Sequence, residues 1–177
     1  MKNLIAISIA GTLISLCGCF SNQKPASPVD EYIEMLKSFE NSEITTSPSM
    51  CWEIKHDFRV IYTSAKFASF RCESYEYSGG AHGMPNTIVG SIRNGRILKL
   101  ADLPDQNRIK NLFQQALKAH PEYQTIRKYA KFSGKYPQIT EDFYLDDKGI
   151  HFIYQPYEIA PFSSGTIDIF IAYRLEQ

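Results

Sequence analysis

The chain has 177 residues, enough for one domain with a hydrophobic core of ordinary size. It carries 19 Lys and Arg residues against 19 Asp and Glu residues, so its formal net charge is zero. A neutral chain has no long-range field to recruit nucleic acid or an anionic membrane surface, and we therefore expect no nucleic-acid partner. Aromatic residues make up 13% of the chain, which favours a β-rich fold.

The first 18 residues have the pattern of a signal peptide. Lys2 gives a positive start, residues 4–16 carry no charge, and the run ends well short of the ~20 apolar residues that a spanning helix needs. The sequence Leu16-Cys17-Gly18-Cys19 resembles the lipobox of bacterial lipoproteins. We therefore expect Cys19 to be the lipidated first residue of a membrane-anchored lipoprotein that faces the periplasm or the exterior. Cleavage by the ordinary signal peptidase, which would release a secreted protein, is the alternative.

The mature chain is predicted to have two parts: a lipidated start and polar tether at residues 19–27, and a single domain at residues 28–177. Ser27-Pro28-Val29-Asp30 has the composition of a helix start, because a capping serine precedes proline at the first helical position. Apolar residues follow at helical spacing up to Phe39. The pattern predicts a short N-terminal amphipathic helix.

Two pairs of strands come next. Trp52–Tyr62 and Lys66–Tyr77 are expected to pair across a tight turn, and Thr87–Arg93 and Arg96–Leu100 across Asn94-Gly95. Asn-Gly is a strong hairpin signal because both turn positions require φ > 0.

A disulfide between Cys51 and Cys72 is chemically allowed in an oxidising compartment. A turn near Ser64 would place Cys72 opposite Asp57, ~20 Å from Cys51 at the usual strand rise of about 3.3 Å per residue. A disulfide needs Cα atoms within ~7 Å. Because a bulge would change this register, the disulfide stays an open alternative.

The stretch Tyr75–Asn86 reads Y-E-Y-S-G-G-A-H-G-M-P-N, and its glycines free the backbone around His82 from the Cβ restriction. His82 is then either a structural hydrogen-bonding group in a glycine turn or the centre of a binding surface. The expected structural turn residues of the chain are Gly79, Gly80, Gly83, Asn94, Gly95 and Gly165.

The second half alternates helical and strand patterns. A stripe at the 3.6-residue period predicts one helix after Leu103-Pro104-Asp105, and Pro121 separates it from a second, weaker helix. Further strands are expected at Phe143–Leu145, Ile150–Tyr154 and Thr166–Leu175. Two prolines keep residues 156–162 out of helix and central strand. The predicted fold class is α+β, with a mainly antiparallel sheet built from hairpins and packed against the central helical pair and the short N-terminal helix.

Two motifs carry a family resemblance. Y-S-G-G-A-H-G at residues 77–83, and the run from Phe143-Tyr144-Leu145 to Ser163-Ser164-Gly165, resemble the extracellular domain of the anti-sigma factor RsiV and the accessory domain of PdaC-type peptidoglycan deacetylases. The resemblance covers roughly residues 52–175. It implies an envelope-facing accessory or sensing module, which in the anti-sigma branch recognises lysozyme. The deacetylase catalytic domain has no counterpart in this sequence, so its activity does not carry over.

Chemical motifs are sparse. The four histidines lack the spacing of a metal site, so no metal and no cofactor are expected. Asp146-Asp147 is interpreted as a turn, because aspartate is a preferred turn residue. Ser78 and His82 could be read as a nucleophile and its base, but the sequence has no G-x-S-x-G elbow around the serine, so we do not expect them to form a catalytic pair. The carboxylate of Glu158 is expected to accept backbone N–H groups in an irregular loop.

The expected ligand-binding residues are Tyr77, His82, Asn86, Tyr157, Glu158 and Pro161. We therefore expect a lipid-anchored, non-enzymatic envelope protein that binds or senses a cell-wall glycan or an envelope protein such as lysozyme. Its expected partners are the membrane, through the lipid on Cys19, and peptidoglycan or a lysozyme-like protein. The alternative is a small hydrolase of cell-wall glycan or its acyl groups, with His82 and Glu158 as acid and base.

Overall fold

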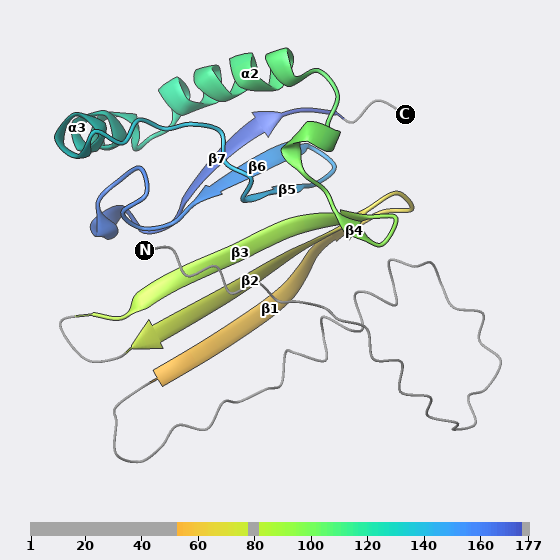
Figure 1. Cartoon of the computed structure of the whole chain (residues 1–177), viewed down its shortest axis with the longest axis horizontal. Helices are drawn as coiled ribbons and strands as arrows, with labels where there is room; N and C mark the ends of the chain where they lie inside the picture. Colours follow the sequence, from red (N-terminus) through yellow and green to blue (C-terminus); the bar gives the residue numbers. More distant parts are fainter. Residues whose placement is uncertain (1–52, 78–81, 175–177) are drawn as a thin grey trace.

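The computed structural model describes residues 53–77 and 82–174, and within them it shows two antiparallel sheets and two α-helices (Figure 1). The first sheet has the order β1 (Glu53–Thr63), β2 (Ala68–Tyr77), β3 (Met84–Arg93) and β4 (Arg96–Ile97). The second has the order β5 (Phe143–Leu145), β6 (Gly149–Tyr154) and β7 (Ile167–Ala172). The helices are α2 (Gln106–Ala119) and α3 (Tyr123–Ser133), and the 3₁₀ turns are η1 (Leu100–Asp102) and η2 (Phe162–Ser164). The predicted α+β class is confirmed, although the strands form two sheets instead of one.

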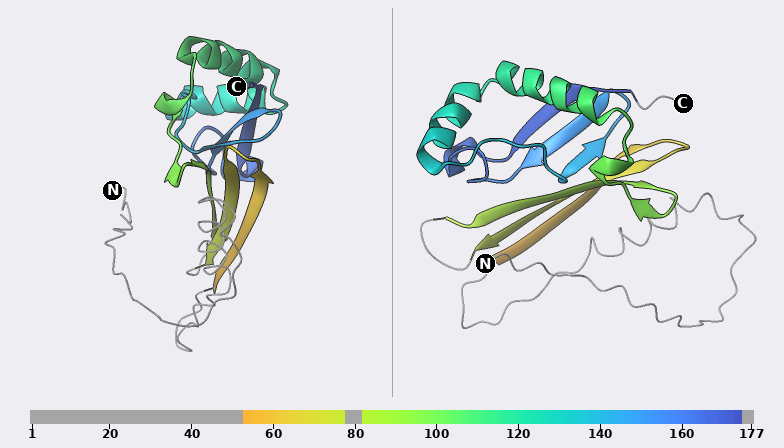
Figure 2. Two further views of the ribbon diagram at one scale, coloured as in Figure 1. Left: turned by 90° about the vertical axis from the view of Figure 1, so that its right-hand side faces the viewer. Right: turned by 45° about the horizontal axis from the view of Figure 1, so that its top comes forward.

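The smaller sheet lies between the helices and the larger sheet (Figures 1 and 2). One of its faces packs against the buried stripes of α2 and α3, and the core joins alternate residues of β6 and β7 to Ile109, Phe113, Leu117 and Ile126. The ring of Phe113 meets that of Phe152 edge to face at 5.4 Å. Because each fully buried aliphatic or aromatic side chain contributes ~1.5–3 kcal/mol, this layer supplies most of the stabilisation.

The β3–β4 hairpin follows the local sequence. Asn94 and Gly95 have φ of 53° and 73°, as a two-residue turn of this kind requires. The strand after it is shorter than the predicted Arg96–Leu100, because the chain turns inward to bury Leu98 and then enters η1. The carboxylate of Asp102 accepts the backbone N–H of Lys99 and closes this turn.

The β1–β2 register differs by one residue from the predicted one. The Ser64–Phe67 loop is closed by a backbone hydrogen bond of 2.9 Å, and a bulge interrupts β1 between Val60 and Tyr62. Cys72 therefore lies opposite Phe58, and the prediction of Asp57 was wrong. Cys72 is a half-buried free thiol. Cys51 lies outside the described residues.

The start of α2 follows the predicted signal, and the end of α3 has an equally local cause. Asp105 precedes α2, and its carboxylate accepts the N–H of Arg108 at 3.0 Å. Gly134, in the left-handed region, ends α3. The predicted N-terminal helix, Cys19, Gly79 and Gly80 lie outside the described residues. Within the ranges that the structure describes, no helix is long and apolar enough to cross a membrane.

Gly83 is required for close packing and not for a positive φ. A Cβ at this position would lie 2.4 Å from the ring of Tyr75 and 2.7 Å from the carbonyl oxygen of Glu76. Its N–H donates to the Tyr75 hydroxyl at 3.0 Å. The glycine therefore lets the chain pass over Tyr75 just before β3 begins.

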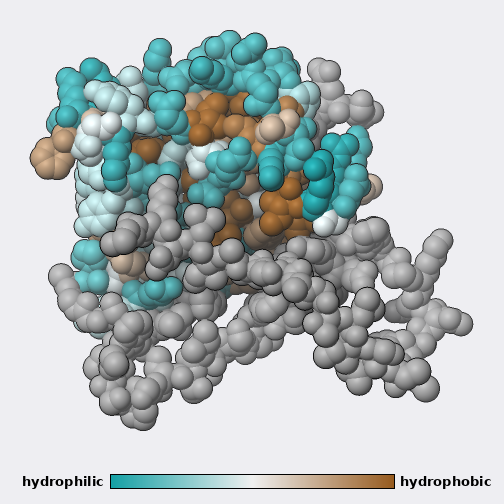
Figure 3. Space-filling view, viewed as in Figure 1, coloured by the Kyte–Doolittle hydropathy of each residue, from teal (hydrophilic) through white to brown (hydrophobic). Residues whose placement is uncertain are grey.

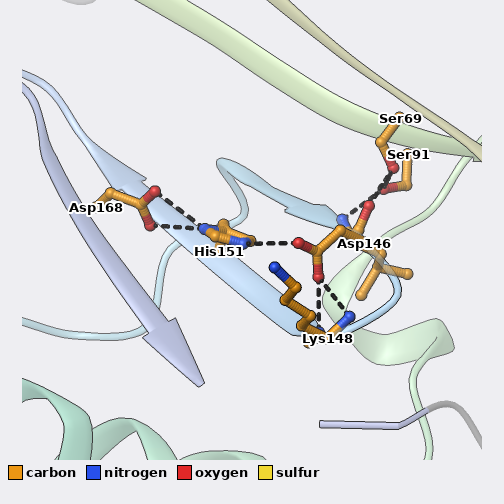
Figure 4. A network of polar contacts seen from close by, with 8 residues as sticks. Ser69, Ser91, Asp146, Lys148, His151 and Asp168 are labelled. Atoms are coloured by element: carbon orange, nitrogen blue, oxygen red, sulfur yellow. Dashed lines mark hydrogen bonds and ion pairs between the residues drawn. The ribbon is translucent and has the colours of Figure 1, made fainter. Parts of the chain in front are cut away.

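Two buried serines join the two sheets (Figure 4). Ser69 on β2 faces Ser91 on β3 with 2.7 Å between the hydroxyl oxygens. The Ser69 hydroxyl donates to the carbonyl of Leu145 at 2.6 Å, and the N–H of Leu145 donates to the Ser91 hydroxyl at 2.8 Å. Because the Ser69 proton is used on Leu145, the Ser91 hydroxyl donates to Ser69. The pair thus satisfies the N–H and the carbonyl of Leu145 at the point where the sheets meet.

Ser91→Ala is expected to destabilise the protein by ~1–3 kcal/mol, because it leaves the buried N–H of Leu145 without an acceptor. Urea unfolding of the purified protein measures this loss. The matched control is Ser74→Ala, at a half-buried position on β2. Equal unfolding midpoints for Ser91→Ala and the control would contradict the role of the serine pair.

Candidate functional site

His82 and the segment after β6 meet at Phe162. The rings of His82 and Phe162 stack with centroids 4.0 Å apart, and the ring of Tyr157 lies 5.5 Å from that of Phe162. His82 and Tyr157 are exposed and Phe162 is half-buried. The Nδ1 atom of His82 lies 3.0 Å from the carbonyl oxygen of Gly83, which fixes the ring. We call His82, Tyr157 and Phe162 the aromatic surface.

Tyr157 has a strained backbone. Its φ of 66° is in the left-handed region, which costs a residue with a Cβ ~1–2 kcal/mol. The strain is held by local hydrogen bonds: the Tyr129 hydroxyl donates to the Tyr157 carbonyl at 2.9 Å, and the Glu158 carboxylate accepts the N–H of Gln155 at 2.9 Å. Strained backbone positions cluster at active sites and ligand-binding sites, so Tyr157 is a candidate contact residue.

An open groove of about 840 Å³ borders the aromatic surface. One wall is the segment after α3, and the other is the end of β6 with the loop that follows it. The side chains in these walls that can stack on a ligand or form hydrogen bonds are Tyr136, Gln138, Asp142, Gln155, Tyr157 and Glu158. Tyr136 is 65% exposed, so the groove presents aromatic faces together with carboxylates and amides. Such a set offers stacking and both kinds of hydrogen-bonding group, which suits a hydroxyl-rich ligand.

The groove is tied to the larger sheet through Gln155. The side-chain amide of Gln155 accepts the N–H of Thr87 at 2.9 Å and donates to the carbonyl of Thr87 at 2.6 Å. Thr87 lies on β3, and its backbone would otherwise lack these partners. The loop that carries Tyr157 therefore starts from a fixed point.

The structure brings four of the six predicted ligand-binding residues into this region. His82 and Tyr157 contact Phe162, Pro161 precedes Phe162, and Glu158 follows Tyr157 in the groove wall. The other two residues belong to the first sheet: Tyr77 ends β2, and Asn86 is exposed on β3 opposite Ser74. Phe162 and Tyr136 were not predicted as site residues. A signal for Tyr136 exists, since it is a large aromatic in a polar segment after a helix-ending glycine.

A second polar cluster lies on the face of the smaller sheet that does not pack against the helices (Figure 4). The Nδ1 atom of His151 lies 3.0 and 3.2 Å from the carboxylate oxygens of Asp168, and Nε2 lies 3.3 Å from Asp146. The Tyr144 ring stacks on His151 at 4.4 Å. Asp146 also accepts the N–H groups of Lys148 and Gly149, so Asp146-Asp147 forms a turn as predicted. Alternation along the hairpin was the signal that could have placed Tyr144 and His151 together.

The geometry of this cluster favours a structural role. Both ring nitrogens of His151 already face carboxylates, so neither is available as a base for a substrate. In the part of the chain that the structure describes, no three His, Cys, Asp or Glu side chains converge on a metal position. The cluster instead joins the β5–β6 turn to β7.

Burial and the carboxylates act in opposite directions on His151. Burial lowers the pKa of the imidazole, but the hydrogen bonds and charges of Asp168 and Asp146 raise it by more, so the pKa lies above its usual 6.5. For Asp146, burial raises the pKa, but the N–H groups of Gly149 and Lys148, together with His151, bring it below its usual 3.8. The charged forms of both groups are therefore favoured in the folded protein.

Comparisons with known proteins match two successive parts of the chain. The family described as "Deacetylase PdaC" matches residues 20–85, and the family described as "Protein of unknown function (DUF3298)" matches residues 100–174. The search of curated proteins found no match.

Two solved structures are similar to the chain. A DUF3298 family protein from Bacteroides fragilis is 27% identical with a TM-score of 0.59, over 86% of this chain and 68% of that one. A DUF3298 family protein from Pseudomonas aeruginosa PAO1 is 22% identical with a TM-score of 0.57, over 69% of this chain and 59% of that one. The similarity to the Pseudomonas protein shows a shared fold alone, and the chain spans 59% of the length of that protein.

The His151 cluster predicts a pH-dependent stability. Because the pKa of His151 is raised on folding, its contribution is fully present below about pH 6.5 and disappears as pH rises through the folded pKa. The contribution of Asp146, whose pKa is lowered, is present above about pH 3.8 and is lost as pH falls. Urea unfolding at a series of pH values from ~5 to ~9 should show a loss of stability with rising pH in the wild type that His151→Gln lacks. His120→Gln, outside the cluster, should keep the wild-type slope; an identical slope in all three proteins would refute the assignment.

Proposed function

Because the chain belongs to the DUF3298 and PdaC-type domain family, we propose that it is a lipid-anchored protein of the bacterial cell envelope that binds a cell-wall glycan or an envelope protein such as lysozyme, without catalysis of its own. The groove beside Tyr157 is the proposed binding site. The observation that carries the proposal is the exposed ring of Tyr157, held on a strained backbone above a groove of carboxylates and amides.

The chemistry of the groove favours a glycan over a protein partner. A sugar ring offers an apolar face for stacking and hydroxyl groups that both donate and accept. Tyr136 and Tyr157 supply the faces, and Asp142, Glu158 and Gln138 supply the polar contacts. A volume of about 840 Å³ is in the range of small-molecule sites, which suits a few sugar units.

The contacts of His82 and Glu158 support binding more than hydrolysis. A hydrolase that used them as acid and base would need both groups directed at one bond. His82 instead stacks on Phe162 with Nδ1 beside the Gly83 carbonyl, and Glu158 accepts the N–H of Gln155. Each side chain is engaged by its own local segment.

Binding is tested with residues 20–177 and soluble peptidoglycan fragments, with lysozyme as a second ligand. Tyr157→Ala should weaken glycan binding by about tenfold, which corresponds to a lost aromatic contact of ~1.4 kcal/mol. Phe132→Ala, an exposed aromatic residue outside the groove lining, is the control and should bind like the wild type. Binding of lysozyme alone would assign a protein partner, and binding of neither ligand would contradict the proposal.

The lipid anchor has its own test. Metabolic labelling of cells with a fatty-acid analogue should mark the wild-type protein and leave Cys19→Ser unmarked, because the thiol of Cys19 is the proposed attachment point. Cys17→Ser is the matched control and should be marked like the wild type. Equal labelling of Cys19→Ser and the wild type would exclude Cys19 as the lipidated residue.

A further inference from the structure

Charge is strongly segregated in this neutral chain. Residues 106–140, which contain α2, α3 and the following segment, carry seven Lys or Arg residues and one acid, Glu122. All seven cations are exposed: Arg108, Lys110, Lys118, Arg127, Lys128, Lys131 and Lys135. The helices form the outer layer of the molecule, and on the face that Figure 3 shows its outer edge is mainly hydrophilic. The zero net charge of the whole chain therefore conceals a basic layer.

These cations have no acidic partner among the described residues. The ion pairs found there lie elsewhere, on β1, β2, the β4–η1 segment and the His151 cluster. Arg108 and Arg127 lie over the rings of Tyr173 and Tyr123 at 5.7 and 5.8 Å. Glu122 is half-buried, with its carboxylate 3.4 Å from the Ser164 hydroxyl. Among the described residues, the charges of this layer are therefore not neutralised by ion pairs.

Two exposed aromatic rings lie among the cations of α3 and the segment after it. Phe132 is 91% exposed, the largest value among the exposed large hydrophobic residues that the structure describes, and Tyr136 is 65% exposed. Lys128 lies one helical turn before Phe132, and Lys131 and Lys135 flank it in the sequence. Lysines beside a protruding aromatic ring are two of the features of segments that lie in a membrane interface, although the apolar stripe of α3 itself is buried in the core.

We propose that the α3 end of the helical layer docks on an anionic phospholipid surface, with the cations at the headgroups and the Phe132 ring in the acyl boundary. This goes beyond glycan binding, because the partner is a lipid surface and the contact centres on Phe132, Lys128 and Lys131, none of which lines the groove, although Lys135 and Tyr136 lie at the border of both. Charge complementarity selects an anionic partner, and Phe132 selects a lipid over a soluble anionic polymer, which offers no apolar interior.

The test uses the full chain bound to vesicles, with a fluorescent reporter at the proposed point of insertion. The background Trp52→Phe removes the single natural tryptophan, and Phe132→Trp places the reporter on α3. On phosphatidylglycerol vesicles the Trp emission should shift to shorter wavelength and be quenched severalfold by brominated acyl chains. On phosphatidylcholine vesicles, or in ~0.5 M salt, the shift and the quenching should be largely lost, because salt screens the headgroup attraction.

Two variants control for the N-terminal membrane attachment, which is the same in all proteins. Lys128→Glu with Lys131→Glu should remove the quenching at position 132, and neither residue lines the groove, so glycan binding should persist. A reporter at Ile97→Trp, 52% exposed on β4, should stay unquenched. Equal quenching on phosphatidylglycerol and phosphatidylcholine, or binding of dextran sulfate without any shift on anionic vesicles, would overturn the proposal.

Discussion

The arrangement of the molecule depends on the hydroxyl pair of Ser69 and Ser91. These two side chains accept and donate for the backbone of Leu145, so β5 is fixed against β2 and β3 without pairing to either of them. The unpaired edge of a short strand inside a protein costs free energy unless its polar groups find partners. Because the serines supply these partners, the edge of β5 can be buried against the larger sheet while one face of the smaller sheet packs on the helices.

The position of the proposed binding groove depends on this junction. One wall leads from α3 into β5, and the other leaves the end of β6, so both start from elements that the junction holds in place. Gln155 adds a second link, from the start of the irregular loop to the backbone of Thr87. Loops display binding residues well when their ends are rigid, and the strained Tyr157 lies two residues after such a fixed point.

Features with local causes could be predicted from the sequence, and features that depend on distant residues could not. Asn94-Gly95, the Asp105 and Gly134 helix ends and the Asp146 turn each follow from the conformational preferences of adjacent residues. The way the two sheets are joined depends on a contact between residues 69, 91 and 145, which no local pattern encodes. The stacking of His82 on Phe162 is equally distant in sequence. Net charge is a sum over the whole chain, so a value of zero could not show that seven cations and one acid lie in residues 106–140.

The central claim is that a ligand enters the groove beside Tyr157. The most direct measurement is an NMR titration of ¹⁵N-labelled protein with soluble peptidoglycan fragments, followed through backbone amide shifts. The account predicts saturable shifts concentrated at residues 134–142 and 154–162, with β1 and the β3–β4 turn unchanged. Saturable shifts that avoid both groove walls, or the absence of any shift at millimolar ligand, would contradict it.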